Sequence, residues 1–217
     1  MTTYNQIAGK RTQRIEAISD GVFAVAFTLL ILDIKVPISE AIKTEGDLFR
    51  SLCNLMPEFL TYFLSFMTLG IFWTGHSTQY DYIEESDRHL NWISLFFLLF
   101  VSLVPFTTAF LSAHIQFRLS IGIYWLNIFL LGVIIYLQWT YAEKHGFISI
   151  PEKEQKSISN AIKRRVIVAQ TLYGISALLC FINIYLSIFA TILIQLNYAL
   201  ALFSRPLYKS KTNLNEN

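Results

Sequence analysis

Long apolar runs are the feature that most constrains this chain. Several stretches approach or exceed ~18 residues, a length typical of a helix that crosses a lipid bilayer and not of a helix buried in a soluble core. Charged residues make up 15% of the sequence, whereas soluble domains carry roughly a quarter. Because backbone groups must satisfy one another in lipid, the sequence predicts an all-α integral membrane protein built as a helical bundle.

Six transmembrane helices in a single domain over residues 1–217 are predicted from these runs. Pro57 suits the first turn of the second span, and Pro105 is expected to kink the third. The last two spans share one long apolar run, which we divide at a turn near residues 183–187. The predicted spans are 15–34, 57–76, 90–111, 119–141, 166–183 and 187–203.

Lysine and arginine positions predict the orientation. With six spans, thirteen of the 17 basic residues fall on the side that holds both termini, and the other four fall on the opposite side. Since basic residues concentrate in cytoplasmic loops, both termini are predicted to be cytoplasmic, in a multi-pass protein of the plasma membrane. The four residues on the outer side are Lys35, Lys43, Arg50 and Arg118.

Residues 147–165 are expected to form a cytoplasmic loop with a short amphipathic helix. Two interpretations of its basic cluster, residues 163–165, are open: a site for acidic lipid, or an ordinary anchor that follows the positive-inside rule. Aromatic residues at both ends of the fourth span are predicted to lie at the membrane interfaces; they are Tyr124, Trp125, Trp139 and Tyr141.

The first predicted span carries polar residues in an otherwise apolar run. Asp20 lies inside this run, where a charge is costly unless it faces the bundle interior or water. The alternative is an aspartate near the cytoplasmic interface, stabilised by the helix N-terminus and a cation. Gly21, Val25, Thr28 and Leu32 follow the helical period and form one narrow stripe, with Asp20 beside it. Such a stripe fits either a pore lining or a packing seam of small residues.

The same segment resembles the signature of the transmembrane-protein-175 family, the lysosomal-type potassium channels and their bacterial relatives. The family pattern is Arg, three residues, Phe-Ser-Asp, then Gly-Val-Phe-Ala-Ile-Ala and a Thr-Leu-Leu run. The departures are Ile18 for the Phe and Val25 for the usual Ile or Leu. Matching residues are Arg14, Ser19, Asp20, Gly21, Val22, Phe23, Ala24, Ala26, Thr28, Leu29 and Leu30.

The rest of the chain is similar to the family more loosely. Ser65, Trp73 and His76 follow the family's second-span pattern, and residues 104–109 are similar to its Pro-Phe-x-Thr-Ala. Ser94 stands where the family has an Asn, so one interhelical hydrogen bond is expected to differ.

The resemblance implies a potassium-permeable channel whose first helix lines the pore. It looks like a single-repeat bacterial member, which implies a homotetramer with fourfold symmetry. By position, Val25 is the apolar constriction, Thr28 the hydroxyl layer and Leu32 the outer apolar layer, with Leu29 bordering the lumen. No Thr-Val-Gly-Tyr-Gly sequence occurs, so a carbonyl filter of that type is excluded. Structural and gating roles, and not an ion site, are implied for Arg14, Ser19, Asp20, Trp73 and His76.

Other function classes find less support in the sequence. No metal-ligand spacing, nucleophile elbow or phosphate loop appears, so neither an enzyme nor a bound cofactor is expected, and no basic patch suggests nucleic acid. The expected partners are further copies of the chain, membrane lipid and potassium as the permeant ion. Two readings of the acidic segment 81–89 are a cation site and an ordinary cytoplasmic loop. The alternative function is a proton- or cation-coupled secondary transporter, although no inverted repeat is evident.

Overall fold

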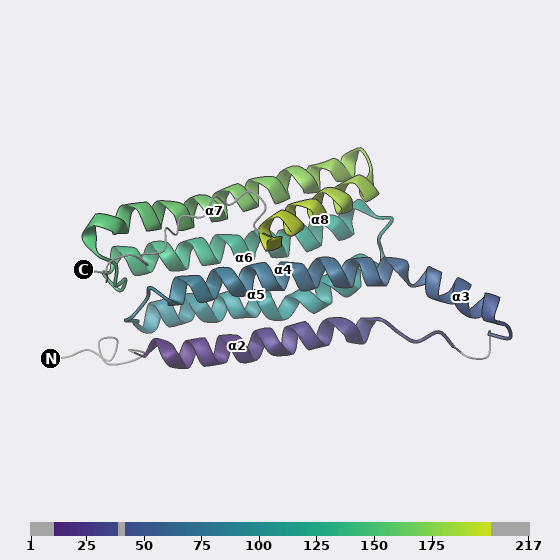
Figure 1. Cartoon of the computed structure of the whole chain (residues 1–217), viewed down its shortest axis with the longest axis horizontal. Coiled ribbons are helices and arrows are strands. Elements are labelled where there is room, and N and C mark those ends of the chain that lie inside the picture. Colours follow the sequence, from purple (N-terminus) through teal and green to yellow (C-terminus); the bar gives the residue numbers. More distant parts are fainter. Residues whose placement is uncertain (1–10, 39–41, 201–217) are drawn as a thin grey trace, which may run out of the picture.

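The structure is a computed structural model that describes residues 11–38 and 42–200. Within these ranges the regular elements are helices, and Figure 1 shows the long ones lying side by side, with α2 along one edge and α7 along the opposite edge. In chain order they are α2 (Thr12–Leu29), the 3-10 helix η1 (Leu30–Asp33), α3 (Glu45–Asn54), α4 (Met56–Tyr80), α5 (Arg88–Ala113), α6 (Arg118–Lys144), α7 (Glu152–Leu178), the 3-10 helix η3 (Leu179–Phe181) and α8 (Ile184–Leu200).

Four of the described helical segments are long and apolar enough to cross a membrane: α2 with η1, α5, α6, and α7 with η3. A fifth is obtained when α3 and α4, which meet at a bend of 42°, are counted as one span. Helix α8 is apolar, and its described part, which ends at the last described residue, has 17 residues. The protein is therefore all-helical, with four or five apolar spans in its described part.

Helix α7 differs from the sequence expectation. The region 147–165 was predicted to be a cytoplasmic loop with a short amphipathic helix separate from the fifth span, but α7 begins at Glu152, directly after Pro151, and runs without a break to Leu178. The polar half of the helix is held against α6, because the Trp139 indole N–H donates to the Ser159 hydroxyl at 3.1 Å. The chain then reverses at residues 182–183, where the Asn183 side chain accepts from the first turn of α8.

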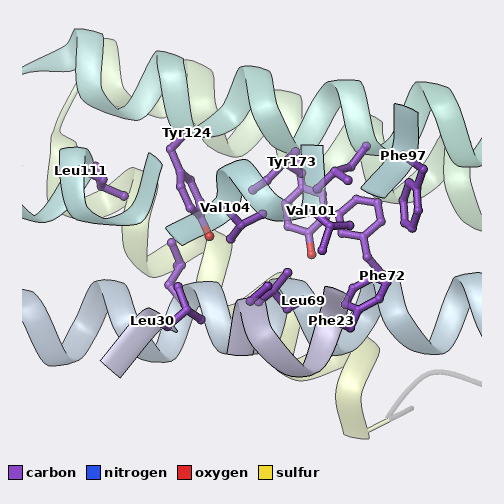
Figure 2. Packing of buried hydrophobic residues seen from close by; sticks show 14 of the residues in the cluster. Phe23, Leu30, Leu69, Phe72, Phe97, Val101, Val104, Leu111, Tyr124 and Tyr173 are labelled. Atoms are coloured by element: carbon purple, nitrogen blue, oxygen red, sulfur yellow. The ribbon is translucent and has the colours of Figure 1, made fainter. Parts of the chain in front are cut away.

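The centre of the bundle is an apolar cluster built from all the long helices. Lipid is as apolar as these side chains, so close packing and hydrogen bonds, and not exclusion from water, hold transmembrane helices together. Phe97 and Val101 on α5 are fully buried in the cluster. Figure 2 shows the side chains that meet there, among them Phe23, Leu30, Leu69, Phe72, Phe97, Val101, Val104, Leu111, Tyr124 and Tyr173.

A buried hydroxyl network adds hydrogen bonds between four helices. The Tyr124 hydroxyl of α6 lies 3.2 Å from the Ser65 hydroxyl and 3.0 Å from the Thr68 hydroxyl, both on α4. Thr108 of α5 donates to Ser65 at 2.6 Å, and the Gln195 amide of α8 donates to Thr68 at 2.6 Å. Because an unpaired hydroxyl is costly in an apolar medium, these contacts fix how the four helices pack.

Two aromatic residues predicted at the membrane interfaces are buried instead. Tyr124 is 4% exposed and Trp139 is 0% exposed. Each finds a partner for its polar tip inside the bundle, Tyr124 on α4 and Trp139 on α7, so neither needs the headgroup region. Trp125 and Tyr141 are half-buried.

Candidate pore-lining face

Helix α2 has one buried face, which packs against α4 and α5. The buried residues recur every three or four positions, as expected for one side of a helix. They are Ile15, Ser19, Phe23, Ala26 and Leu30. Phe23 reaches furthest inward, and its ring lies 6.0 Å from the ring of Phe97 on α5.

The opposite face of α2 is apolar and exposed. Val25 is 56% exposed, Leu29 is 42% exposed and Leu32 is 69% exposed, and Thr28 is exposed beside them. Gly21 lies on the same face, and a Cβ added to it would meet nothing within 4 Å. In the described part of the chain, therefore, no other helix packs at Gly21.

The Thr28 hydroxyl is oriented by its own helix. It lies 3.1 Å from the Ala24 carbonyl oxygen and 2.9 Å from the Val25 carbonyl oxygen, and it donates its proton toward them. A hydroxyl oxygen also carries two acceptor lone pairs. With the proton engaged by the backbone, the exposed side of this oxygen can only accept, which is the property that a cation requires.

Asp20 is connected to the neighbouring helix through Trp73. The Trp73 indole N–H of α4 donates to Asp20 Oδ1 at 3.0 Å, and both residues are exposed. The other two residues of the motif make no such connection. Ser19 donates to the Ile15 carbonyl oxygen of its own helix at 2.7 Å, and Arg14 is exposed without a hydrogen bond or ion pair to any residue between 11 and 38 or 42 and 200.

His76 lies in the core and not at the exposed motif. It is 3% exposed, and its ring is stacked on that of Phe97 with centroids 5.0 Å apart and planes 2° apart. Phe23 of α2 and Tyr80 also contact the imidazole. Its Nε2 atom has no hydrogen-bond partner among the described residues. The structure thus brings Asp20 and Trp73 together and holds His76 behind Phe23, on the buried side of α2.

Comparison with known proteins identifies the family to which these helices belong. Residues 14–105 match the sequence model of the family described as endosomal/lysosomal potassium channel TMEM175. A protein of Chamaesiphon minutus named as a potassium channel is 33% identical over 193 residues, which cover 87% of this chain and 94% of that protein. The chain belongs to the TMEM175 family. The prediction made from residues 14–30 is therefore confirmed.

Other relatives in the TMEM175 family agree. A potassium channel of Streptomyces collinus is 31% identical over 85% of this chain and 90% of its own length. The crystal structure of a lysosomal potassium-selective channel TMEM175 homolog from Chamaesiphon minutus has a TM-score of 0.76 and 29% identity, covering 88% of this chain and 97% of that one. Human TMEM175, named an endosomal/lysosomal proton channel, is 33% identical over 61% of this chain but only 28% of its own length.

The sequence interpretation missed a buried amide pair in this TMEM175 chain. Gln138 on α6 donates to the Gln79 side-chain oxygen at 3.2 Å, and Gln79 donates to the Ile135 carbonyl oxygen at 3.0 Å. Ser94, at the position where an Asn was expected, lies 3.2 Å from Gln138 Oε1 and 2.7 Å from the Tyr80 hydroxyl. This one serine therefore connects α5 to both α4 and α6. Gln138, inside the predicted fourth span, was the available signal, whereas Gln79 lies in a polar segment beyond the predicted second span.

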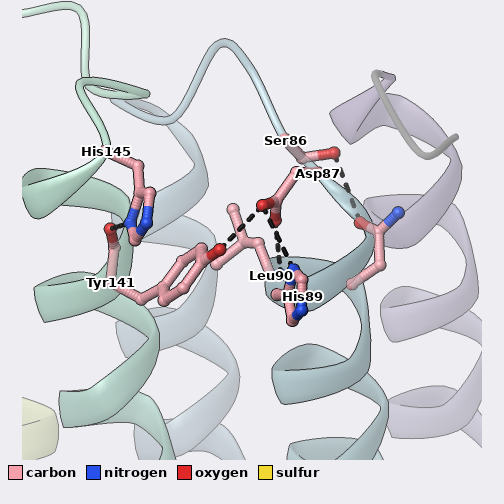
Figure 3. Close-up of polar contacts among 7 residues, drawn as sticks. Ser86, Asp87, His89, Leu90, Tyr141 and His145 are labelled. Carbon is pink, nitrogen blue, oxygen red and sulfur yellow. Dashed lines mark hydrogen bonds and ion pairs between the residues drawn. The ribbon is translucent and has the colours of Figure 1, made fainter. Parts of the chain in front are cut away.

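The acidic segment 81–89 acts as a helix cap, and nothing described supports a cation site there. Asp87 accepts from the Leu90 backbone N–H at 2.8 Å and from the Tyr141 hydroxyl at 2.7 Å, with His89 Nδ1 at 3.6 Å (Figure 3). Burial raises the pKa of the Asp87 carboxyl, but these hydrogen bonds and the charges of His89 and His145 lower it more, so its pKa lies below the ordinary value. Over residues 11–38 and 42–200, no three His, Cys, Asp or Glu side chains gather as metal ligands.

Proposed function

We propose that this protein is a potassium-permeable channel whose pore is lined by the exposed face of α2. The observation that carries the proposal is that α2 turns Val25, Thr28 and Leu32 away from the rest of its own chain. Membership of a family described as a potassium channel, and bacterial relatives named as potassium channels, support the ion. The same membership argues against an enzyme.

The proposed filter works through side chains and not through backbone carbonyls. Rings of Val25 and Leu32, with Leu29 at the border of the lumen, form apolar constrictions that hinder ions by dewetting. Between them, the Thr28 oxygens replace part of the water shell of the ion. Potassium loses water at a lower free-energy cost than sodium, so a path that removes part of the shell favours potassium.

The proposed assembly is a homotetramer in the plasma membrane, with the four α2 helices around the fourfold axis. Six spans per chain are proposed, with α8 as the sixth and α3 with α4 as the second. Both termini are proposed to be cytoplasmic, on the basis of the thirteen-to-four distribution of basic residues. The exposed apolar stripe supports this position of the fourfold axis, because in a closed ring of four chains the stripe of every copy has the same surroundings.

Ion flux through the purified protein in liposomes tests the proposal. We expect potassium flux that follows the electrochemical gradient and saturates poorly, with a reversal potential that favours potassium over sodium. A saturating, slow flux with obligatory coupling to a second ion would identify a secondary transporter instead. No flux of any cation would refute the channel.

Proton permeation is a second candidate, favoured by one finding: the animal relatives are named proton channels. A pH-sensitive dye inside the same liposomes measures it. Proton flux without potassium flux would replace potassium by protons as the permeant ion.

A further inference from the structure

A partly open cavity lies between α4, α6, α7 and α8, on the side of the bundle away from α2. Its volume is about 210 Å³, below the roughly 300–1,000 Å³ of pockets that enclose a drug-sized ligand. Most of its lining is apolar, with Ile71 and Phe72 of α4, Ile135 of α6 and Val166 of α7. The size and the lining suit a segment of one hydrocarbon chain.

Arg165 lines the same cavity, where the composition of α7 changes. From Glu152 to Arg165 the helix is rich in charged and polar residues, and from Val166 onward it is mainly apolar. The Arg165 guanidinium lies over the Tyr198 ring, 5.9 Å from its centroid. In the described part of the chain it has no carboxylate partner, whereas Lys163 is paired with Glu143. A cation beside lipid is costly unless an anion or water compensates it.

Two polar side chains, Tyr173 and Gln170, also line the cavity. Tyr173 is 3% exposed, and its hydroxyl has no hydrogen-bond partner among the described residues. The Gln170 side-chain oxygen is likewise unpaired there, although its amide nitrogen donates to the Ile128 carbonyl oxygen at 3.2 Å. Buried polar groups are normally hydrogen-bonded, and the Gln195 side chain of α8 lies beside the Tyr173 hydroxyl inside the bundle, so these two groups alone do not indicate a ligand.

We propose that this cavity binds one anionic phospholipid from the leaflet next to the N-terminal half of α7. The lipid phosphate pairs with Arg165, and one acyl chain lies along Ile71, Ile135 and Val166. Charge complementarity selects this occupant, since the apolar lining accepts any lipid chain and the unpaired guanidinium prefers an anionic headgroup.

Native mass spectrometry of the full-length chain in detergent tests the proposal, with phosphatidylglycerol and phosphatidylcholine added in turn. The wild-type protein should retain phosphatidylglycerol about fivefold better, the effect expected for one basic residue that meets an anionic headgroup. Arg165→Gln should abolish this preference. Arg164→Gln is the matched control, because Arg164 is exposed on the same helix and does not line the cavity. It should retain the preference.

A second variant tests the acyl-chain part of the site. Ala169 lines the cavity and Val168, its neighbour, does not. Ala169→Phe should therefore lower the retention of both lipids, and Val168→Phe should not.

Three outcomes would contradict the proposal. If Arg164→Gln and Arg165→Gln lose the preference for phosphatidylglycerol equally, the attraction is diffuse and comes from the basic cluster as a whole. Unchanged lipid retention in Ala169→Phe would show that the acyl chain does not lie in this cavity. Stronger lipid retention in a variant that ends at Leu200 would assign the cavity to residues 201–217 instead. None of these mass measurements depends on ion conduction, so they test the lipid site separately from the proposed channel function.

Discussion

Thr28→Val should remove potassium preference while leaving the fold intact. Thr28 is the only polar side chain between Gly21 and Leu32 on α2, and its hydroxyl bonds only to the backbone of its own helix. Valine has nearly the same shape, and loss of a hydroxyl that bonds back to its own helix costs little stability. The assembled protein should therefore survive the substitution.

The expected effect on permeation follows from the lost oxygens. An ion or polar group left without a hydrogen-bonding partner costs about 1–3 kcal/mol per missing group, and each 1.4 kcal/mol corresponds to a factor of ten. Loss of the hydroxyl ring should thus reduce the potassium-to-sodium permeability ratio about tenfold or more. Thr28→Ser keeps the oxygen and should behave almost as wild type.

Reversal potentials under potassium and sodium gradients measure this ratio. The matched control is Thr171→Val on α7, since Thr171 is also exposed and its hydroxyl donates to the Ile167 carbonyl oxygen of its own helix at 2.9 Å. The reasoning is refuted if Thr28→Val keeps the wild-type ratio, or if Thr171→Val changes it equally. Either result would mean that a different face of α2 meets the ion.

Four further predictions concern the constriction, the motif, the assembly and a helix cap. Val25→Asn should hydrate the constriction, raising the basal current and weakening potassium preference; an unchanged current would place Val25 outside the lumen. Asp20→Ala should lower thermal stability by about 1–3 kcal/mol by removing the acceptor of the Trp73 indole, whereas Asp20→Asn should retain most of it; an altered ion preference in either would put Asp20 in the pore. Mass measurement in detergent should give four times the chain mass of 25.0 kDa, and a stable monomer would contradict the tetramer. Asp87→Ala should cost about 1 kcal/mol at pH 7 through loss of the α5 cap. Because the folded pKa of Asp87 lies below its ordinary value, its ionised form stabilises the fold above pH ~4 and the benefit is lost as the pH falls through the folded pKa, so wild type and variant should converge in acid.

Helical periodicity predicted which residues of α2 share a face, but it left open whether that face is exposed. Residues 21, 25, 28 and 32 must share one side of any α-helix, and the structure leaves that side uncovered by the rest of the described chain. The burial of the His76 side chain could not be predicted from helical periodicity. The sequence places it near a helix end, but its burial depends on Phe23 and Phe97, which come from two other helices.

The polar half of α7 shows why charge is a poor guide to helix boundaries. The segment 147–165, rich in Lys, Glu and Ser, was expected to be a cytoplasmic loop with only a short amphipathic helix. It is helical nevertheless, since α6 extends beyond the apolar region and offers partners such as Glu143 for Lys163 and Trp139 for Ser159. The polarity shows where α7 changes from polar to apolar, after Arg165, but it could not predict where the helix begins. The same border positions the cavity proposed to bind phospholipid.

The exposed residues of α2 differ in type from those of α5, and this difference bears on the proposed pore face. Exposure of apolar residues means little in a membrane, because lipid covers them as well as protein does. Helix α5 exposes Phe96, Leu99 and Phe106, large apolar side chains that suit contact with acyl chains, with a single hydroxyl, that of Ser102, among them. The exposed face of α2 instead combines Gly21 and Thr28 with Val25, and it continues toward the charged residues near the helix N-terminus. Small and hydroxyl-bearing residues gain nothing from lipid, but they permit close approach between helices and coordination of an ion. Together with the exposure of Val25, Thr28 and Leu32, this composition supports α2 as the helix proposed to surround the pore.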